Sequence, residues 1–227
     1  MRSVGATQVR ELVGRGLDFS RDGIKILDGV DVALRGRERV ALTGPSGSGK
    51  STLISLLAGL DRPDSGTVTL DGSPIENRTA GLRRRIGVVF QGYALVALLT
   101  ATENIEVPLV AAGITPEEAA RRSRQALART GLAERAAHLV EELSGGQQQR
   151  LAVARTLAAR PDVLLVDEPT TEQDPAHRAQ TVTAVLREAD RGAAVLLATH
   201  DEQIATRCDR WIHLEGGRLT QQGSPDH

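Results

Sequence analysis

At residues 44–52 the chain reads Gly44-Pro45-Ser46-Gly47-Ser48-Gly49-Lys50-Ser51-Thr52, between the apolar segment Val40–Thr43 and a helical pattern over Lys50–Leu60. The run matches G-x-x-x-x-G-K-[ST] at every defined position, and strand, glycine loop and helix follow in the order that this pattern requires. Glycines let such a loop turn its backbone N–H groups inward, and the following helix directs its positive end to the same point. A glycine-rich turn without a ligand is the alternative, but the context favours a phosphate-binding loop.

Three side chains of this loop have a place in phosphate chemistry. Lys50 is one of only two lysines in the 227 residues, the other being Lys25. We expect Lys50 to hold the β- and γ-phosphates of a nucleotide, since a compact ammonium suits that place. Ser51 supplies a hydroxyl to Mg²⁺, and Thr52 is placed to bond a phosphate oxygen.

Two acids follow a second apolar segment. Val163–Val166 is a run of apolar residues that ends in Asp167 and Glu168. In open α/β folds, ligands bind at the carboxyl ends of the strands. We therefore expect Asp167 to orient the Mg²⁺ shell and Glu168 to act as general base for an attacking water. Adjacent acids at a strand end can also be solvated groups without a function, and it is the glycine loop in the same chain that favours chemistry.

A third motif combines a serine with two glycines at the start of a helical pattern, in the run Leu143-Ser144-Gly145-Gly146-Gln147. Serine is a preferred helix cap, so an ordinary capped helix accounts for the run. A second anion-binding helix terminus accounts for it equally well. The spacing alone leaves both interpretations open.

Taken together, the glycine loop, the Leu143–Gln147 run and the Asp167-Glu168 pair resemble the nucleotide-binding subunit of ATP-binding cassette (ABC) transporters over nearly the whole chain. The resemblance implies an ATPase that uses ATP and Mg²⁺. It also implies that Gln91 is the Q-loop glutamine, which senses Mg²⁺ and couples to a membrane partner. His200, at the end of a later strand, resembles the switch histidine that contacts the γ-phosphate.

The resemblance further implies partners. Two cassettes of this family pack head to tail, so that Ser144–Gly146 of one chain close on the γ-phosphate held by the other, which is a second copy or a related cassette. A separate integral membrane permease completes the transporter and holds the cytoplasmic chain at the inner face of the cell membrane. Thr102–Ile105 with Val107–Leu109 resembles the lipoprotein-releasing, macrolide-exporting and cell-division branch, which implies export or membrane extraction.

Two other functions compete with transport. Cell-division relatives suggest a regulatory ATPase that transmits a conformational change across the membrane without moving a substrate. A nucleic-acid or translation ATPase of the same superfamily is disfavoured, because such proteins generally need a long coiled coil or two cassettes in one chain. The net charge of −1 also offers no electrostatic case for binding nucleic acid.

The chain departs from the family pattern in three places. Thr170-Thr171-Glu172-Gln173-Asp174 stands where the branch has T-G-N-L-D, so Asp174 is kept in a segment that normally communicates between the two ATP sites. The aromatic residue that stacks on adenine should fall near Leu17, with Phe19 two residues on; leucine would make a weaker contact, and Phe19 could substitute only if the loop shifts. Arg37 stands where a glycine usually precedes Glu38.

For the fold we expect a single α/β domain over residues 1–227: a P-loop NTPase core with a mainly parallel sheet, helices on both faces and antiparallel N-terminal strands. The core would comprise about 1–90 and 160–227, and a helical subdomain over about 91–159 would carry the Leu143–Gln147 run. The expected strands are Ile24–Leu27, Val30–Leu34, Val40–Thr43, Thr67–Leu70, Val163–Val166, Ala193–Thr199 and Trp211–Leu214. The polar tail from Gly216 onward is expected to be loosely held.

Local signals outside these motifs are weaker. Thr115-Pro116 predicts a helix start and Gly131 its end, and the arginines between them interleave with Glu117 and Glu118, which favours a solvated helix face. No apolar run approaches the about 20 residues that span a bilayer, and Met1–Val13 lacks the apolar core of a secretory signal. The single cysteine, Cys208, is expected to be a buried packing residue.

Overall fold

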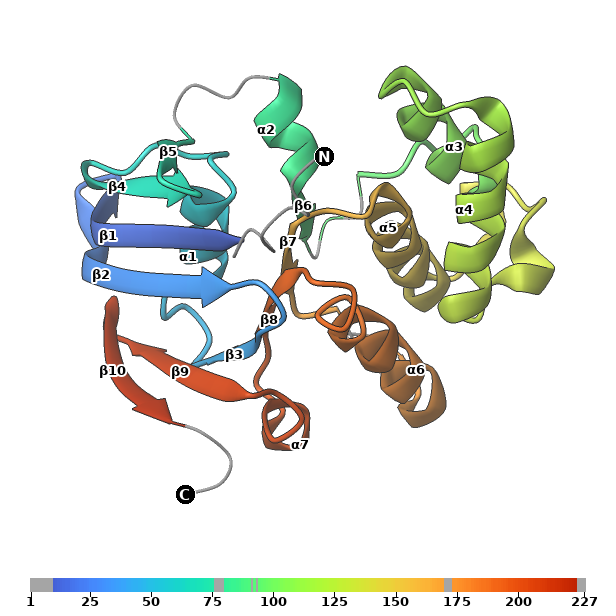
Figure 1. The fold of residues 1–227 in the computed structure, drawn as a ribbon. Helices are drawn as coiled ribbons and strands as arrows, with labels where there is room; N and C mark the ends of the chain where they lie inside the picture. The colour runs from blue at the N-terminus through green and yellow to red at the C-terminus, as the bar shows by residue number, and fades with distance from the viewer. Residues whose placement is uncertain (1–9, 76–79, 91, 93, 170–172, 224–227) are drawn as a thin grey trace, which may run out of the picture.

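The computed structural model describes residues 10–75, 80–90, 92, 94–169 and 173–223, and Figure 1 shows their arrangement. A six-stranded sheet has the order β10-β9-β3-β8-β7-β6, formed by Arg218–Gly223, Arg210–Glu215, Arg39–Thr43, Ala194–Ala198, Val163–Asp167 and Ile86–Val89. β3 pairs parallel with β8 and β9, and β7 pairs parallel with β6 and β8. The predicted parallel sheet is therefore confirmed.

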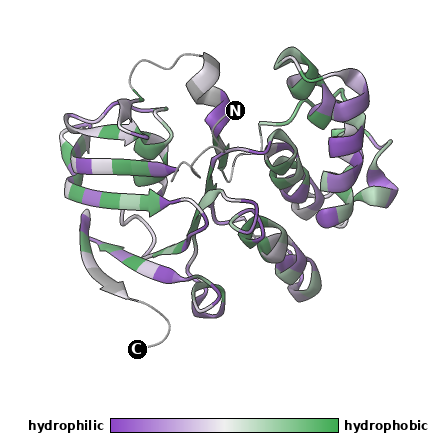
Figure 2. Ribbon diagram, in the orientation of Figure 1, coloured by the Kyte–Doolittle hydropathy of each residue, from purple (hydrophilic) through white to green (hydrophobic). Residues whose placement is uncertain are grey.

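A four-stranded antiparallel sheet stands beside it, with the order β2-β1-β4-β5 formed by Ile24–Arg35, Glu11–Arg21, Ser65–Leu70 and Ser73–Pro74. The expected division of β2 into two strands is wrong, because β1 pairs with it over most of its length. β1 itself was not predicted from the sequence. Its glycines and arginines interrupt the apolar alternation that marks a strand, as the banded colouring in Figure 2 shows.

The central strands are buried on both sides, which explains why their sequences are continuous apolar runs. All residues of β7 and β8 are buried. Alternate side chains of a strand point to opposite faces. Thus Val163 and Leu165 join a cluster with α1 (Lys50–Leu57), whereas Leu164 and Val166 join a second cluster with α5 (Gly145–Ala159) and α6 (Pro175–Leu186).

Helices α3, α4 and α5 (Ala101–Ala111, Pro116–Arg129 and Gly145–Ala159) share a third hydrophobic cluster of their own. The remaining helices are α2 (Ala80–Arg85), α6 (Pro175–Leu186), α7 (Glu202–Ala205) and two short 3₁₀ turns, Ala133–Arg135 and Val140–Glu142. α4 begins after the cap Thr115, whose hydroxyl accepts from the Glu118 N–H at 3.3 Å, and stops before Gly131. Both predicted ends of this helix are confirmed.

The C-terminal tail forms a strand, so the expectation of a loosely held tail is wrong as far as residue 223. β9 and β10 pair antiparallel across Gly216-Gly217, whose φ angles of 56° and 76° suit the tight two-residue turn of a hairpin. Leu219 packs against the core. Cys208 is buried as predicted, and burial raises the pKa of its thiol to about 11. No helix among the described residues is long and apolar enough to cross a membrane.

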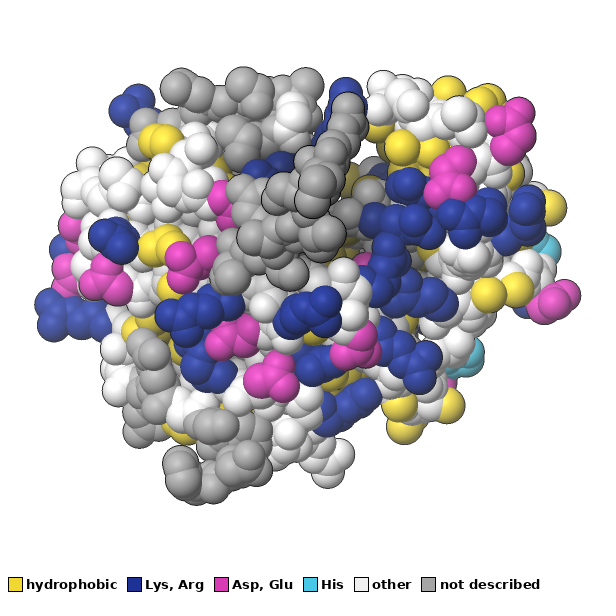
Figure 3. Space-filling view, in the orientation of Figure 1, with side chains coloured by type: hydrophobic (Ala, Val, Ile, Leu, Met, Phe, Trp, Pro, Cys, Tyr) yellow, Lys and Arg dark blue, Asp and Glu magenta, His cyan; other side chains and the backbone are white. Residues whose placement is uncertain are grey.

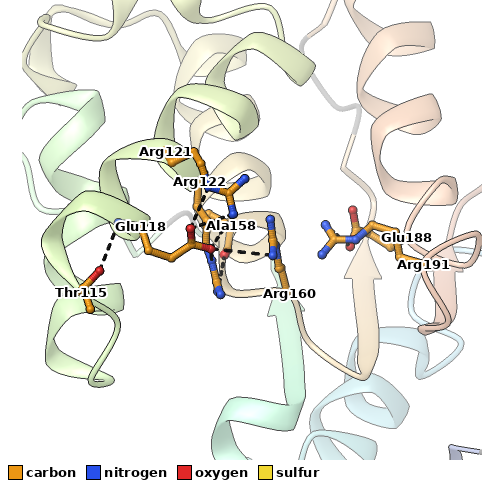
Figure 4. Close-up of polar contacts among 8 residues, drawn as sticks. All are labelled: Thr115, Glu118, Arg121, Arg122, Ala158, Arg160, Glu188 and Arg191. Carbon is orange, nitrogen blue, oxygen red and sulfur yellow. Dashed lines mark hydrogen bonds and ion pairs between the residues drawn. The ribbon is translucent and has the colours of Figure 1, made fainter.

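Lys and Arg side chains gather over the α4 and α5 side of the molecule in Figure 3. Figure 4 shows how Glu118 lies among them: it accepts hydrogen bonds from the Nε atoms of Arg122 and Arg121, both at 2.7 Å. These bonds lower the pKa of Glu118 to about 2. Arg121 fits the predicted solvated face, but Arg122 reaches the carbonyl of Ala158 at the end of α5, at 3.5 Å.

A buried carboxylate links α4 to the end of α6. Glu188 is only 1% exposed; its Oε1 lies 2.7 Å from Nη2 of Arg129, and its Oε2 lies 3.4 Å from Nη1 of Arg191. Arg129 also donates to the carbonyl of Ala184 at 2.7 Å. The same arginine therefore ties a helix of the third cluster to a helix that covers the sheet.

We expect Glu188→Ala to lower the free energy of unfolding by about 2–3 kcal/mol, because it removes a buried carboxylate together with both of its ion pairs and leaves Arg129 and Arg191 without that partner. Urea unfolding measures the effect. Glu118→Ala is the matched control: it also removes a glutamate that pairs with arginines, but water screens that site, so the loss should be much smaller. An equal or larger loss for Glu118→Ala would contradict the assignment.

Candidate functional site

The glycine-rich loop adopts a conformation that requires its glycines. Gly44, Gly47 and Gly49 have φ angles of 143°, 77° and 103°, a region that other residues rarely adopt. A Cβ on Gly44 would lie 2.2 Å from the carbonyl oxygen of Leu214 on β9. Gly49 precedes α1, and no side chain caps this helix start, so its first backbone N–H groups face the loop uncovered. This geometry is that of an anion cradle.

Lys50 lies within the loop. Its side chain is 7% exposed, and Nζ donates hydrogen bonds to the carbonyls of Gly44 at 2.8 Å and Pro45 at 2.9 Å. These bonds hold the ammonium group at the loop, where it can pair with phosphate oxygens.

The two predicted acids lie at the carboxyl end of β7, across from the loop. Burial raises the pKa of the Asp167 carboxyl, and a hydrogen bond with the Ser51 hydroxyl acts in the opposite direction. Glu168 follows with a φ of 44°, in the left-handed region. His200, just beyond β8, brings its Nδ1 to 3.5 Å from Glu168 Oε1. The structure thus brings together Lys50, Ser51, Asp167, Glu168 and His200. The first and the last of these are 150 residues apart in the sequence.

A cavity of about 460 Å³ lies between the loop and these acids, lined by Ile26, Ser46, Gly47, Gly49, Lys50, Ser51, Thr52, Asp167 and Glu168. A larger hollow, of about 570 Å³, lies against β1 and β2 and includes no residue of the glycine loop. We take the smaller cavity as the candidate site, because only there do backbone donors, an ammonium group and carboxylates converge.

The predicted adenine contact at Leu17 is wrong. Leu17 is fully buried in the hydrophobic core, so its side chain cannot face a ligand. Phe19 is 9% exposed in the same core, and the Arg21 guanidinium lies over its ring, 5.6 Å from the centroid. Ile26 of β2 instead lines the cavity, and sequence reasoning missed it because an isoleucine within a strand carries no motif.

The Leu143–Gln147 run forms a capped helix start within the chain. Ser144 Oγ accepts from the Gln147 N–H at 3.4 Å, and the Gln147 side chain accepts from the Ser144 N–H at 2.9 Å, a reciprocal capping box. None of the residues that line the 460 Å³ cavity belongs to this run. Within one chain, therefore, the structure does not bring Ser144, Gly145 and Gly146 to the glycine loop.

Asp174 caps α6. Its Oδ1 accepts from the N–H groups of Ala176 and His177, both at 3.1 Å, and its Oδ2 contacts the His177 ring. The His177 bonds hold the pKa of Asp174 at about 2. The predictions for Gln91 and for Thr170–Glu172 concern residues outside the described part of the chain.

The residues at the cavity offer oxygen ligands to a divalent cation. Among the described residues no three His, Cys, Asp or Glu side chains cluster as a metal site by themselves. Of the side-chain oxygens that line the cavity, the Ser51 hydroxyl and the Asp167 carboxylate are hydrogen-bonded to one another. This small oxygen set suits Mg²⁺, which keeps several waters and binds protein through one or two carboxylates together with substrate phosphates.

The sheet order, the glycine loop and the acids at the end of β7 define a P-loop nucleoside triphosphatase. The family described as ABC transporter matches residues 27–171 of the chain. The chain belongs to the ABC transporter family, as an ATP-binding and ATP-hydrolysing cassette.

Relatives support this assignment over nearly the full length. The uncharacterized ABC transporter ATP-binding protein YbbA of Escherichia coli K12 is 39% identical, over 94% of this chain and 95% of its own. The lipoprotein-releasing system ATP-binding protein LolD of Maricaulis maris is 44% identical, over 87% and 89%. Among solved structures, the cassette MJ0796, a dimer in a post-hydrolysis state bound to ADP and Pi, superposes with a TM-score of 0.86 at 32% identity, covering 94% and 98%.

Proposed function

We propose that this cassette works as an ATP-closed dimer, with a second copy or a related cassette, and drives a separate membrane permease in export or membrane extraction. The chain would then lie in the cytoplasm, at the inner face of the cell membrane. LolD relatives are named for lipoprotein release, and a relative of Pseudomonas aeruginosa is a pyoverdine export ATP-binding/permease protein. These names support an export or extraction role over import.

The residues at the cavity take distinct roles in this proposal. The N–H groups of the glycine loop and Lys50 bind the phosphates, and Ser51 and Thr52 complete the cradle. Ser51 and Asp167, with Gln91, would hold Mg²⁺, which neutralises charge on the phosphates when bound. Glu168 accepts a proton from the attacking water, and His200 contacts the γ-phosphate side of the site.

The main support for the proposed dimer is that, within one chain, no residue of the Leu143–Gln147 run lines the cavity. Ser144–Gly146 form a helix start with anion-binding character, yet they line no part of the glycine-loop cavity. A head-to-tail pair related by a twofold axis would bring each run to the partner's cavity and complete two sites. The similar cassette MJ0796 was solved as a dimer, which supports dimerisation of this chain.

Mixing two inactive variants tests whether the sites are shared. Lys50→Ala disables the loop, and Ser144→Arg disables the helix start, so neither variant alone should hydrolyse ATP. In an equal mixture half of the dimers pair the two variants, and each of these has one intact composite site, so about a quarter of the wild-type rate should return. Gel filtration with ATP checks that mixed dimers form. A site contained in one chain predicts no recovery.

The role of the permease is tested separately, after reconstitution with the membrane partner. ATP-dependent movement of a substrate supports transport. ATP turnover without movement of any substrate would favour the regulatory role instead.

A further inference from the structure

Glu168 has an unusual backbone conformation. Its φ of 44° lies in the left-handed region, although it is not a glycine. For such a residue this conformation is unfavourable and persists only where surrounding contacts impose it. One contact comes from the sheet, since the Glu168 N–H donates to the Ala198 carbonyl of β8 at 3.1 Å.

Two buried amides add further contacts at this turn. Gln149 of α5 donates through Nε2 to the Glu168 carbonyl at 2.9 Å. Gln173, just before α6, donates through Nε2 to the Pro169 carbonyl at 2.8 Å. Each of the two carbonyls in the turn after β7, those of Glu168 and Pro169, therefore accepts a hydrogen bond from a glutamine side chain.

The two amides also orient each other. Gln173 Nε2 donates to Gln149 Oε1 at 3.1 Å, and the Thr181 hydroxyl of α6 donates to Gln173 Oε1 at 2.9 Å. Gln149, Gln173 and Thr181 are 1%, 9% and 0% exposed. We call Gln149, Gln173 and Thr181 the amide relay. The side-chain oxygen of each glutamine accepts a hydrogen bond and the side-chain nitrogen of each donates one, so neither amide can rotate without leaving buried polar groups unpaired.

We propose that Gln149 and Gln173 are positioning residues for ATP hydrolysis, and that the amide relay holds the left-handed turn at Glu168 so that its carboxylate faces the phosphate cradle. The inference rests on the proposed role of Glu168. Gln173 stands where the T-G-N-L-D run of the family pattern has leucine, which offers no hydrogen bond. The relay also connects the turn to α5, the helix that begins at Ser144–Gly146, and to α6.

The test measures kcat and KM for ATP in four variants of the full chain. Gln173→Leu and Gln149→Leu should each lower kcat about tenfold, the rate equivalent of the free energy of about one hydrogen bond, because the turn at Glu168 loses contacts that hold it; KM should stay within about twofold. Thr181→Val should lower kcat about threefold, since it removes only the outer member. Thr130→Val is the matched control: its buried hydroxyl donates to the Ala126 carbonyl within α4, outside the relay, and kcat should not change.

Gln149→Met is close to glutamine in length and shape and removes the donor to the Glu168 carbonyl without adding a charge, so it is the variant to use if the leucine variants do not fold. Thermal unfolding identifies variants that are folded. Because the relay acts through Glu168, adding Gln173→Leu to Glu168→Gln should cause no further loss in single-turnover rate.

Three outcomes overturn the proposal: kcat unchanged in folded Gln149 and Gln173 variants, a rise in KM at constant kcat, or a full additional loss in the Glu168→Gln background. If Glu168→Gln alone keeps the wild-type rate, the proposed role of Glu168 fails and the relay's positioning role fails with it. If Glu168→Gln loses hydrolysis while the relay variants keep it, the relay alone is refuted.

Discussion

Replacing Glu168 by glutamine is expected to lower kcat for ATP hydrolysis by at least about 100-fold and to leave ATP affinity within about twofold. The substitution keeps the shape of the side chain but removes the group that accepts a proton. The phosphate cradle, with Lys50 bonded to the carbonyls of Gly44 and Pro45, is untouched. Bound ATP should therefore persist and hold two chains together.

Phosphate release measures kcat, ATP titration measures the affinity for ATP, and gel filtration with ATP shows whether two chains stay together. Glu117→Gln is the control, because it makes the same change at an exposed position at the start of α4. Normal turnover by Glu168→Gln would show that Glu168 is not the base. Loss of ATP binding together with turnover would instead indicate that the variant disturbs the cradle.

Replacing Lys50 by alanine is expected to weaken ATP binding about 10- to 100-fold, in contrast to the Glu168 variant. The ammonium group is nearly buried at the loop, where its hydrogen bonds to phosphate are charge-assisted. Hydrolysis should fall because the nucleotide is no longer held in place. Isothermal titration with ATP, and with an analogue that resists hydrolysis, separates affinity from turnover.

The chain offers a matched control for this experiment in its other lysine. Lys25 is half exposed, pairs with Asp18 at 3.0 Å and with Asp28, and is not among the residues that line the cavity. Lys25→Ala should leave ATP affinity unchanged. Equal ATP affinity in the Lys50→Ala and wild-type chains would contradict the assignment of the loop.

Much of the candidate site could be predicted because its parts are local. The three glycines with positive φ angles lie within the six residues 44–49, and α1 begins at the next residue. The G-x-x-x-x-G-K-[ST] pattern therefore specifies both the loop and the helix. Asp167 and Glu168 could be placed because a buried parallel strand ends where ligands bind. The roles of Ser144–Gly146, Gln91 and Asp174 stay predictions, since they concern a second chain or residues outside those described.

The predictions that are wrong concern positions whose surroundings come from distant residues. The family pattern predicts that Leu17 lies near the adenine contact. The pairing of β1 with β2 and β4 instead turns the Leu17 side chain into the core. The tail was judged by its polarity, but pairing with β9 supplies the hydrogen bonds that a polar strand needs. Neither partner is visible in the local sequence.

The phosphate cradle, the caps of the helices and the parallel sheet could all be predicted from the residues alone, because they depend on backbone conformations and apolar periods within about ten residues of the chain. The side chains that surround Glu168 could not be predicted in this way, because they come from distant parts of the chain. Hydrogen bonds connect the turn at Glu168 to Gln149, Gln149 to Gln173, and Gln173 to Thr181, so that three segments of the chain are joined. A hydrogen bond between buried amides produces no periodic pattern in a sequence. The position of these three side chains depends on how α5 and α6 pack against the sheet.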